Sequence, residues 1–331
     1  MTNRERIIKA VKHQEADIIP YTVDLGPEMW EKLKNYYNNE NFAQKLMSPL
    51  SYTGAGGFPV GGWLGDDIVQ DHFGVRWDKS RDKGVGVVIE NLVNEDNVDD
   101  FPFPDSSDPN LYAHMSQRNP DQFVIAAVPL AYFERAWSLC GMENLLAGMA
   151  GDERFVFRLL ERILDFNMTM IRHYVEYDID CVHINDDYGQ QTNLIMGPKH
   201  WRKFFKPGLK EMAGAVKSKG KYVYLHSCGN ISEIIPDLIE IGVDIINPFQ
   251  PEVMDVFHLK NEYGKDMTFH GGISEQMTLN FGTPDDVERE MRDKMARLGK
   301  GGGYILAPSQ GMTANVPAEN AARFIEVASS Q

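Results

Sequence analysis

Residues 222–250 read YVYLHSCGNISEIIPDLIEIGVDIINPFQ and place a short helical stretch between two apolar, β-rich runs. The runs are YVYLHS (222–227) and IINPFQ (245–250), and Pro236 suits an early position of the helix, where its missing N–H costs little. A strand, a helix and a second strand in this order predict a βα unit of a parallel sheet.

The same alternation continues on both sides of this stretch. DIIPYTVD (17–24) can supply an earlier strand, and PAENAARFIEVA (317–328) a closing helix. No G-x-G-x-x-G segment follows any expected strand, so we predict a single (β/α)8 TIM barrel of α/β class rather than an open doubly wound sheet. The other β-rich runs are FVIAAVPL (123–130), CVHIND (181–186), MTFHGG (267–272) and YILAPS (304–309).

An irregular stretch at about residues 50–110 interrupts this pattern. Its Gly and Pro content predicts loops, with a hairpin at VGVVIENLV (85–93). We expect this loop-rich, N-terminal elaboration to decorate one barrel rather than to form a second core, so that residues 1–331 make a single domain.

The composition excludes several classes of function. The 331 residues carry 33 Lys and Arg against 48 Asp and Glu, and this acidic balance argues against a nucleic-acid partner. No window approaches the roughly 18 apolar residues of a membrane span, and three cysteines argue against a disulfide framework, with Cys140 and Cys181 expected in the core. We therefore expect a cytoplasmic protein whose substrate is a neutral or weakly charged small molecule.

Polar side chains follow six of the expected strands. In a TIM barrel the functional residues lie at the carboxyl ends of the strands, so we expect these side chains to meet at one mouth. They are Asp24, Asp186, Asp187, His226, Cys228, Asn247, Gln250, His270, Ser309 and Gln310.

His226 and Cys228 are the strongest pair in this set. Alternation along an extended segment puts both side chains on the same side, and zinc binds nitrogen at about 2.0–2.1 Å and sulfur at about 2.3 Å. The alternative is a buried Cys and a packed His that are neighbours by chance. Asp186 and Asp187 are adjacent, so only one of them can face the pocket directly.

At these residues the chain resembles the uroporphyrinogen decarboxylase superfamily and, within it, the branch of zinc- and corrinoid-dependent methyltransferases. The resemblance covers nearly the whole chain, and it implies the same (β/α)8 barrel. It is carried by RERIIKAVKHQEADIIP (4–20), DHFGVRW (71–77), FPFPD (101–105), NDDYGQQ (185–191), HSCGN (226–230), GVDIINPFQPE (242–252), FHGGIS (269–274), FGTPDDVEREM (281–291) and GGGYILAPSQ (301–310), in the family's order.

The resemblance implies a zinc ion held by His-x-Cys and by a second Cys in the loop after the last strand. His226 and Cys228 match the first part, whereas Gln310 stands where the later Cys is expected. The third protein ligand is therefore open among Asp186, Asp187, Glu252, His270 and Gln310. Within the site we expect Asp186, Asp187 and His270 to be catalytic, and Asp24, Gln191, Asn247, Gln250 and Gln310 to bind the substrate.

The loss of one thiolate has an electrostatic meaning. A neutral ligand in its place leaves about one positive unit on the zinc ion and a stronger Lewis acid, which favours polarising an oxygen atom. We therefore expect a methyl group to move from an O-methyl compound to a Co(I) corrinoid. A carboxylate ligand would restore neutrality and weaken this argument.

The corrinoid is expected on a separate partner protein, because the chain has no D-x-H-x-x-G segment, the common cobalamin-ligand signature. This partner would dock over the barrel mouth, where the Gly-rich loops of residues 54–66 can move to admit it. Tyr52, Phe58 and Trp63 either line an entrance there or pack these loops onto the barrel.

Two alternatives belong to other classes of protein. A porphyrinogen decarboxylase should offer Arg near the mouth to bind carboxylates, yet the loop VDLGPEMWEKL (23–33) has acidic residues before its only Lys. A noncatalytic barrel that senses a metal or a ligand would also tolerate the loss of the later Cys.

Overall fold

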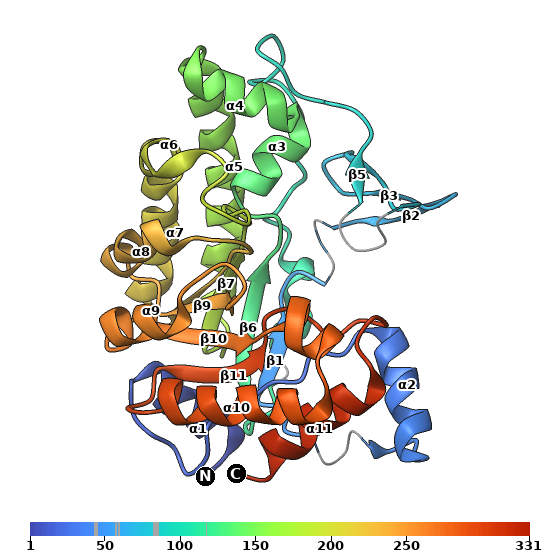
Figure 1. Ribbon diagram of the computed structural model, residues 1–331. Helices are drawn as coiled ribbons and strands as arrows, with labels where there is room; N and C mark the ends of the chain where they lie inside the picture. The colour runs from blue at the N-terminus through green and yellow to red at the C-terminus, as the bar shows by residue number, and fades with distance from the viewer. Residues whose placement is uncertain (43–45, 57, 59, 82–85, 117) are drawn as a thin grey trace.

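The computed structural model describes residues 1–42, 46–56, 58, 60–81, 86–116 and 118–331. Within these residues, a parallel sheet of seven strands runs through the molecule in the order β1–β6–β7–β8–β9–β10–β11 (Figure 1). All six β-rich runs between residues 123 and 309 become strands of this sheet, as predicted. The bounds are β1 (Leu50–Thr53), β6 (Phe123–Val128), β7 (Cys181–Asn185), β8 (Tyr222–His226), β9 (Ile245–Phe249), β10 (Thr268–Ile273) and β11 (Tyr304–Pro308).

Residues 17–24, the expected first strand, do not form a regular strand. Tyr21 and Leu25 make single parallel bridges to Leu306 and Met312, so this segment lies along the outer edge of β11. No pairing joins it to β1 within the described residues. The predicted barrel is therefore confirmed as a curled, TIM-barrel-like sheet of seven strands, and not as a closed ring of eight.

The irregular stretch was expected to begin at about residue 50, but a strand of the main sheet, β1, lies at this position. Leu50–Thr53 pair in parallel register with Phe123–Ala126 of β6, so the main sheet begins inside residues 50–110. The strand has only four residues, LSYT, two of which are small and polar. Such a short run lacks the apolar pattern by which the longer buried strands are recognised.

The outer helices follow from ordinary capping and periodicity. In α10 (Pro284–Leu298), Thr283 and Asp286 form a capping box, and Val287 and Met291 are buried toward the sheet. Figure 1 shows α10 and α11 across one end of the sheet and α5 to α8 along its side. The helices are α1 (Asn3–Val11), α2 (Pro27–Tyr37), α3 (Phe133–Cys140), α4 (Met142–Ala150), α5 (Glu153–Tyr174), α6 (Gly197–Phe204), α7 (Lys206–Ser218), α8 (Ile235–Ile241), α9 (Val256–Tyr263) and α11 (Ala318–Ser329).

A small antiparallel sheet stands beside the main one, at the right of Figure 1. Its strands are β2 (Gly62–Gly65), β3 (Ile68–Gln70), β4 (Arg76–Asp78) and β5 (Val87–Val88). Within the hairpin expected at residues 85–93, the structure has one strand, β5, which pairs with β4. Residues 82–85, which precede it, lie outside the described part of the chain.

A buried ion pair joins this small sheet to the helices. Arg135 of α3 donates to Asp71 over 2.5 Å, and its guanidinium lies 4.2 Å from the centre of the Phe73 ring. The other oxygen of Asp71 accepts the backbone N–H groups of Phe73 and Val75. Burial of both charges makes the pair sensitive to the loss of either partner.

The main core fills the space between the sheet and its helices. Cys140 belongs to this core, and Cys181 belongs to a second cluster that α1 covers at the amino ends of the strands, as expected for both residues. No helix within the described residues is both long and apolar enough to cross a lipid bilayer.

Candidate metal site and cavity

Three donor side chains meet at the carboxyl ends of β7 and β8. Asp187, His226 and Cys228 each offer one ligand atom, and these three atoms lie within 4.8 Å of one another. His226 Nε2 is 3.4 Å from Cys228 Sγ and 3.6 Å from Asp187 Oδ1. Strand alternation thus brings His226 and Cys228 to one point, and Asp187 arrives from the neighbouring strand.

These distances fit a divalent cation with tetrahedral ligands. Zinc bonds of about 2.0–2.3 Å at tetrahedral angles separate neighbouring donor atoms by roughly 3.4–3.6 Å. Zinc also accepts imidazole, thiolate and carboxylate donors in one site. The donor set is therefore suited to zinc, with the charges of Asp187 and a Cys228 thiolate balancing the dication.

Two glycines let the loops that carry these donors lie against each other. A Cβ atom on Gly189 would sit 2.5 Å from the carbonyl oxygen of Cys228, and one on Gly229 would sit 2.4 Å from the carbonyl carbon of Gly189. In addition, Cys228 N–H donates to Asp187 Oδ1 over 2.7 Å. The NDDYG and HSCGN segments therefore form one unit, in which the positions of Asp187 and Cys228 depend on each other.

Asn247 of β9 fixes the orientation of the His226 ring. Its amide oxygen lies 2.8 Å from His226 Nδ1, and its amide nitrogen donates to the carbonyl oxygen of His270 over 3.2 Å. An amide oxygen only accepts hydrogen bonds, so Nδ1 carries the proton and Nε2 keeps its lone pair for a cation. Asn247 was expected to bind the substrate, and the structure places it both here and in the cavity wall described below.

Replacing Asn247 by Leu should weaken zinc binding about 10–100-fold, the usual effect of losing a hydrogen bond to a metal-ligating His. The measurement is a zinc titration against a chromophoric chelator. Asn247→Asp is the matched control, because it keeps an oxygen acceptor for Nδ1–H and should retain zinc affinity. Equal affinity in the Leu variant and the wild type would remove this role from Asn247.

Gln310 contacts Cys228 as a hydrogen-bond donor. Its Nε2 lies 3.1 Å from Cys228 Sγ. Burial, followed by the charge of Asp187, raises the pKa of the Cys228 thiol to about 12, and the bond from Gln310 opposes this rise. Among the five candidates for a third ligand, Asp187 is the one whose ligand atom lies within 4.8 Å of those of His226 and Cys228. A carboxylate in this position would restore neutrality, which is the case that weakens the argument from an extra positive charge.

Asp186 turns away from the three donors. Its buried carboxylate accepts the backbone N–H groups of Tyr132, Phe133 and Glu134, at 3.1, 2.8 and 2.7 Å, where α3 begins. Burial raises the pKa of Asp186 to about 7, although these bonds lower it. Asp186 was expected to be catalytic, and the structure places its carboxylate at the first turn of α3.

Glu134 is a buried carboxylate that the sequence did not single out. Only 7% of the residue is exposed, and its Oε2 has no hydrogen-bond partner in the described structure. Burial, followed by the charges of Asp186 and Asp187, raises the pKa of Glu134 to about 9. In the sequence, Glu134 stands out only as part of a Glu-Arg pair in an otherwise apolar helix start, YFERAW (132–137). This pattern does not indicate which strand end lies near the helix.

A cavity of about 470 Å³ opens beside His226, within the size range of small-molecule sites. Asp24, Tyr52, Tyr224 and Gln310 are in its wall. Among its described lining residues, Asp24 is the sole Asp, Glu, Lys or Arg, and its carboxylate has no partner among the described side chains. The wall of the cavity therefore carries one unpaired negative charge among aromatic, amide and hydroxyl groups.

His270 lies in the same wall as a neutral imidazole. Its Nδ1 is 2.6 Å from the Tyr224 hydroxyl, and its Nε2 is 2.8 Å from Thr22 Oγ1. Burial, followed by the charge of His226, lowers the pKa of His270 to about 3. Both ring nitrogens are engaged, so His270 is fixed in place and is not free to bind a cation with His226.

Three other candidates lie elsewhere. Gln191 is exposed and is not in the cavity wall. Gln250 is buried and accepts the backbone N–H of Gly229 over 2.5 Å, so it shapes the loop after Cys228 rather than the cavity. Glu252 accepts hydrogen bonds from the hydroxyls of two serines, Ser274 and Ser309, away from the three donors.

The aromatic residues expected at the entrance separate into three environments. Tyr52 lines the cavity. Phe58 is buried against His72 and Phe166 and packs its loop onto the core. Trp63 of β2 is 66% exposed on the small sheet.

The fold agrees with the comparisons to known proteins. The profile of the uroporphyrinogen decarboxylase (URO-D) family matches residues 2–331, and the chain belongs to this family. A solved methyltransferase structure from Methanosarcina mazei shares the fold, with a TM-score of 0.70 over 99% of this chain and 98% of that one, at 16% identity.

Curated relatives in this comparison are methyltransferases. The chain is 21% identical over 204 residues to a methylated-thiol–coenzyme M methyltransferase of Methanosarcina mazei, covering 61% of this chain and 52% of that protein. It is 26% identical over 185 residues to the methylcobamide:CoM methyltransferase MtbA of Methanosarcina acetivorans, covering 56% and 51%. The chain thus spans about half the length of the curated relatives it matches.

Proposed function

We propose that this protein is a corrinoid-dependent methyltransferase that moves a methyl group from a small O-methyl compound to the Co(I) corrinoid of a partner protein. The observation that carries the proposal is the cluster of Asp187, His226 and Cys228 at the edge of a cavity without a described cationic side chain. The relatives named above support methyl transfer, and one of them names a methylcobamide as its substrate.

The residues of the cluster would hold a zinc ion in a fixed orientation. Asp187, His226 and Cys228 supply the ligand atoms, and Asn247 keeps His226 Nε2 directed at them. Gln310 donates to the Cys228 sulfur and so stabilises its negative form. When bound, zinc supplies Lewis-acid polarisation of an oxygen atom of the substrate.

The donor set favours an oxygen atom over a thiol as the group that is polarised. In the proposed donor set the Asp187 carboxylate takes the place of the second thiolate that the family resemblance implies, and carboxylates are harder ligands than thiolates. The formal charge is the same in both cases. The preference therefore comes from the hardness of the ligand and no longer from an uncompensated positive charge.

The cavity wall favours an uncharged methyl donor. Asp24 can accept a hydrogen bond from a hydroxyl group of the substrate, and Tyr52 and Tyr224 offer faces for an aromatic ring. An anionic substrate would meet the unpaired charge of Asp24 without a described Lys or Arg to offset it. This also argues against a porphyrinogen, which carries many carboxylates.

The corrinoid would arrive on a partner protein that covers the cavity mouth. The 331 residues contain no D-x-H-x-x-G segment that could bind a cobalamin in the usual way. Exposed Trp63 and Leu64 on β2 offer apolar surface beside the main sheet, where such a partner can be accommodated.

Metal analysis and a methyl-transfer assay test the proposal together. Zinc-loaded protein is mixed with a Co(I) corrinoid protein and a panel of methyl ethers and methylated amines, and formation of methylcobamide is followed by absorbance. Zinc at one equivalent and turnover of an O-methyl compound support the proposal. Zinc binding without turnover across the panel favours the sensing barrel, and release of carbon dioxide from a porphyrinogen favours the decarboxylase.

Asp24→Asn should relax the discrimination against anionic substrates. Removing one exposed negative charge is worth about 1 kcal/mol, so the ratio of kcat/KM for methoxyphenol to that for methoxybenzoate should fall about 5-fold. Activity toward methoxyphenol should change less, because Asn still accepts a hydrogen bond. An unchanged ratio would show that Asp24 does not set substrate charge.

A further inference from the structure

We propose that Glu134 is a further member of the divalent-cation site: it lies outside the three donors that meet within 4.8 Å, and its free carboxylate oxygen would turn toward a cation held by Asp187, His226 and Cys228. The inference rests on the metal-binding part of the proposed function. It adds a residue from α3, on a different segment from the His-x-Cys strand and the loop that carries Asp187.

The first support is the state of the Glu134 side chain. The residue is 93% buried, and Oε2 has no hydrogen-bond partner within the described structure. The neighbouring guanidinium of Arg135 does not neutralise it, because that group donates to Asp71. A buried carboxylate oxygen without a partner costs several kcal/mol unless a charge compensates it, on the order of the penalty for an uncompensated buried ion.

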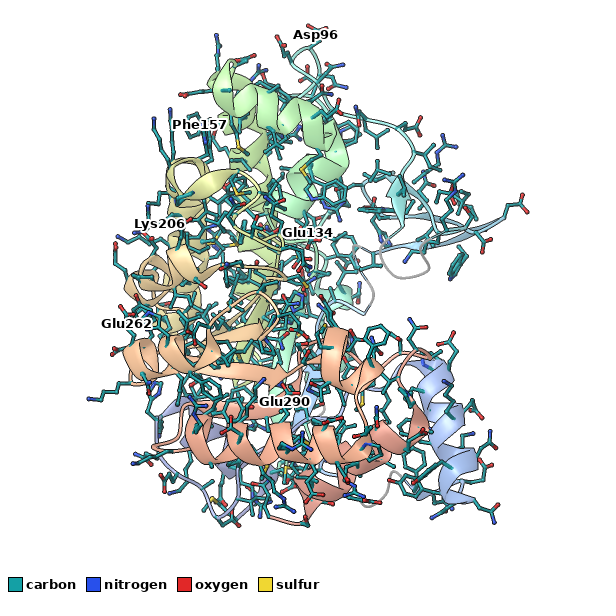
Figure 2. The ribbon with its side chains drawn as sticks, viewed as in Figure 1. Asp96, Glu134, Phe157, Lys206, Glu262 and Glu290 are labelled. Atoms are coloured by element: carbon teal, nitrogen blue, oxygen red, sulfur yellow. The ribbon has the colours of Figure 1, made fainter. Side chains whose placement is uncertain are left out.

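The second support is the position of Glu134 relative to the three donors. Its backbone N–H donates to Asp186 Oδ1 over 2.7 Å, and Asp186 is the residue before Asp187. This bond ties the first turn of α3 to the loop that carries Asp187. The same loop is bonded to the segment that carries Cys228, because the Cys228 N–H donates to Asp187 Oδ1 over 2.7 Å. Figure 2 shows Glu134 near the centre of the molecule, between α3 and the strand ends.

The third support is the charge of the assembled groups. Glu134 and Asp187 are two carboxylates near the thiol of Cys228, and no described Lys or Arg forms an ion pair with either of them. Like charges in a desolvated space repel strongly. A dication compensates both carboxylates at once. A capping role at the start of α3 does not explain Glu134, because Asp186 already accepts the backbone N–H groups there.

A zinc titration with matched variants tests this role. Chelator-treated wild type, Glu134→Gln and Glu275→Gln are titrated with Zn²⁺ alone against a chromophoric chelator. Glu275 is the control because it is also a buried carboxylate, bonded to Asn280 over 2.9 Å and outside the cluster. We expect Glu134→Gln to bind Zn²⁺ about 10–100-fold more weakly and Glu275→Gln to bind like the wild type.

The thermal midpoint supplies a readout that is independent of activity. The metal-free Glu134→Gln protein should melt close to the wild-type midpoint, because Gln has nearly the same size as a protonated Glu, and Zn²⁺ should raise its midpoint less. Glu134→Asp keeps the charge and should bind Zn²⁺ within about 10-fold of the wild type, which tests the role if the Gln variant does not fold.

The outcomes separate this inference from the proposed function. Tight zinc binding by the wild type and an equal affinity in Glu134→Gln would overturn the role of Glu134 and leave the metal site intact. A wild type that binds no zinc would overturn both. Weaker binding in Glu134→Gln but not in Glu275→Gln supports both.

Discussion

Cys228→Ser is expected to remove zinc binding and methyl transfer together. Serine keeps the size of the side chain but offers a hydroxyl that stays protonated near neutral pH, so one of three donors is lost. Zinc affinity should fall at least about 100-fold, and turnover should fall to the rate without protein. Elemental analysis after gel filtration and the methylcobamide absorbance assay measure the two effects on one sample.

The control for this variant is Cys140→Ala, which changes a buried Cys in α3 and leaves all three donors in place. It should retain zinc and turnover, with at most a modest loss of stability. Full activity in Cys228→Ser would contradict the role of the cluster. Loss of zinc with retained turnover would separate the metal from the chemistry.

Arg135→Met is expected to cause a large loss of stability. The substitution leaves the Asp71 carboxylate buried, with two backbone N–H donors and no cation, and side chains in this pair are 2% and 1% exposed. Breaking such a pair costs about 3–5 kcal/mol. The midpoint of urea-induced unfolding, followed by near-ultraviolet circular dichroism, should fall accordingly.

The double variant Arg135→Met with Asp71→Asn tests the cause of this loss. An uncharged Asn can still accept the N–H groups of Phe73 and Val75, so the double variant should be more stable than Arg135→Met alone. A single variant that unfolds at the wild-type midpoint would show that the ion pair does not hold the small sheet against α3.

Local patterns predicted the strands that are apolar and buried on both faces. The runs at 181–186 and 222–227 are of this kind, and they form β7 and β8, with their polar ends at one edge of the sheet. Residues 17–24 have a comparable pattern but pair on one edge only, because their contacts with the rest of the sheet depend on how far the sheet curls. Curvature is a property of the whole sheet, and a local pattern does not contain it.

The part of the candidate site that lies on a single segment could be predicted from the sequence. The spacing of His226 and Cys228 is fixed by strand alternation, and their meeting point needs no knowledge of other elements. The choice between Asp186 and Asp187 needed the position of α3, whose first turn binds Asp186 and so leaves Asp187 toward the donors. Glu134 was missed for the same reason, since its proximity arises from packing between distant segments.

Gln310 shows how a resemblance can locate a position without giving its role. The residue does lie at Cys228, where the second Cys is implied, yet it contacts the sulfur through an amide N–H. In the proposed site the charge of the donor set then depends on Asp187, which lies at another strand end. The proposed preference for oxygen depends on this exchange of a thiolate for a carboxylate.

Anomalous diffraction at the zinc absorption edge, on crystals of the zinc-loaded protein, tests the central claim most directly. We predict one strong peak about 2.0–2.3 Å from His226 Nε2, Cys228 Sγ and an Asp187 oxygen. A zinc peak at another place would contradict the account. So would a map in which these three side chains are well ordered but no peak lies between them.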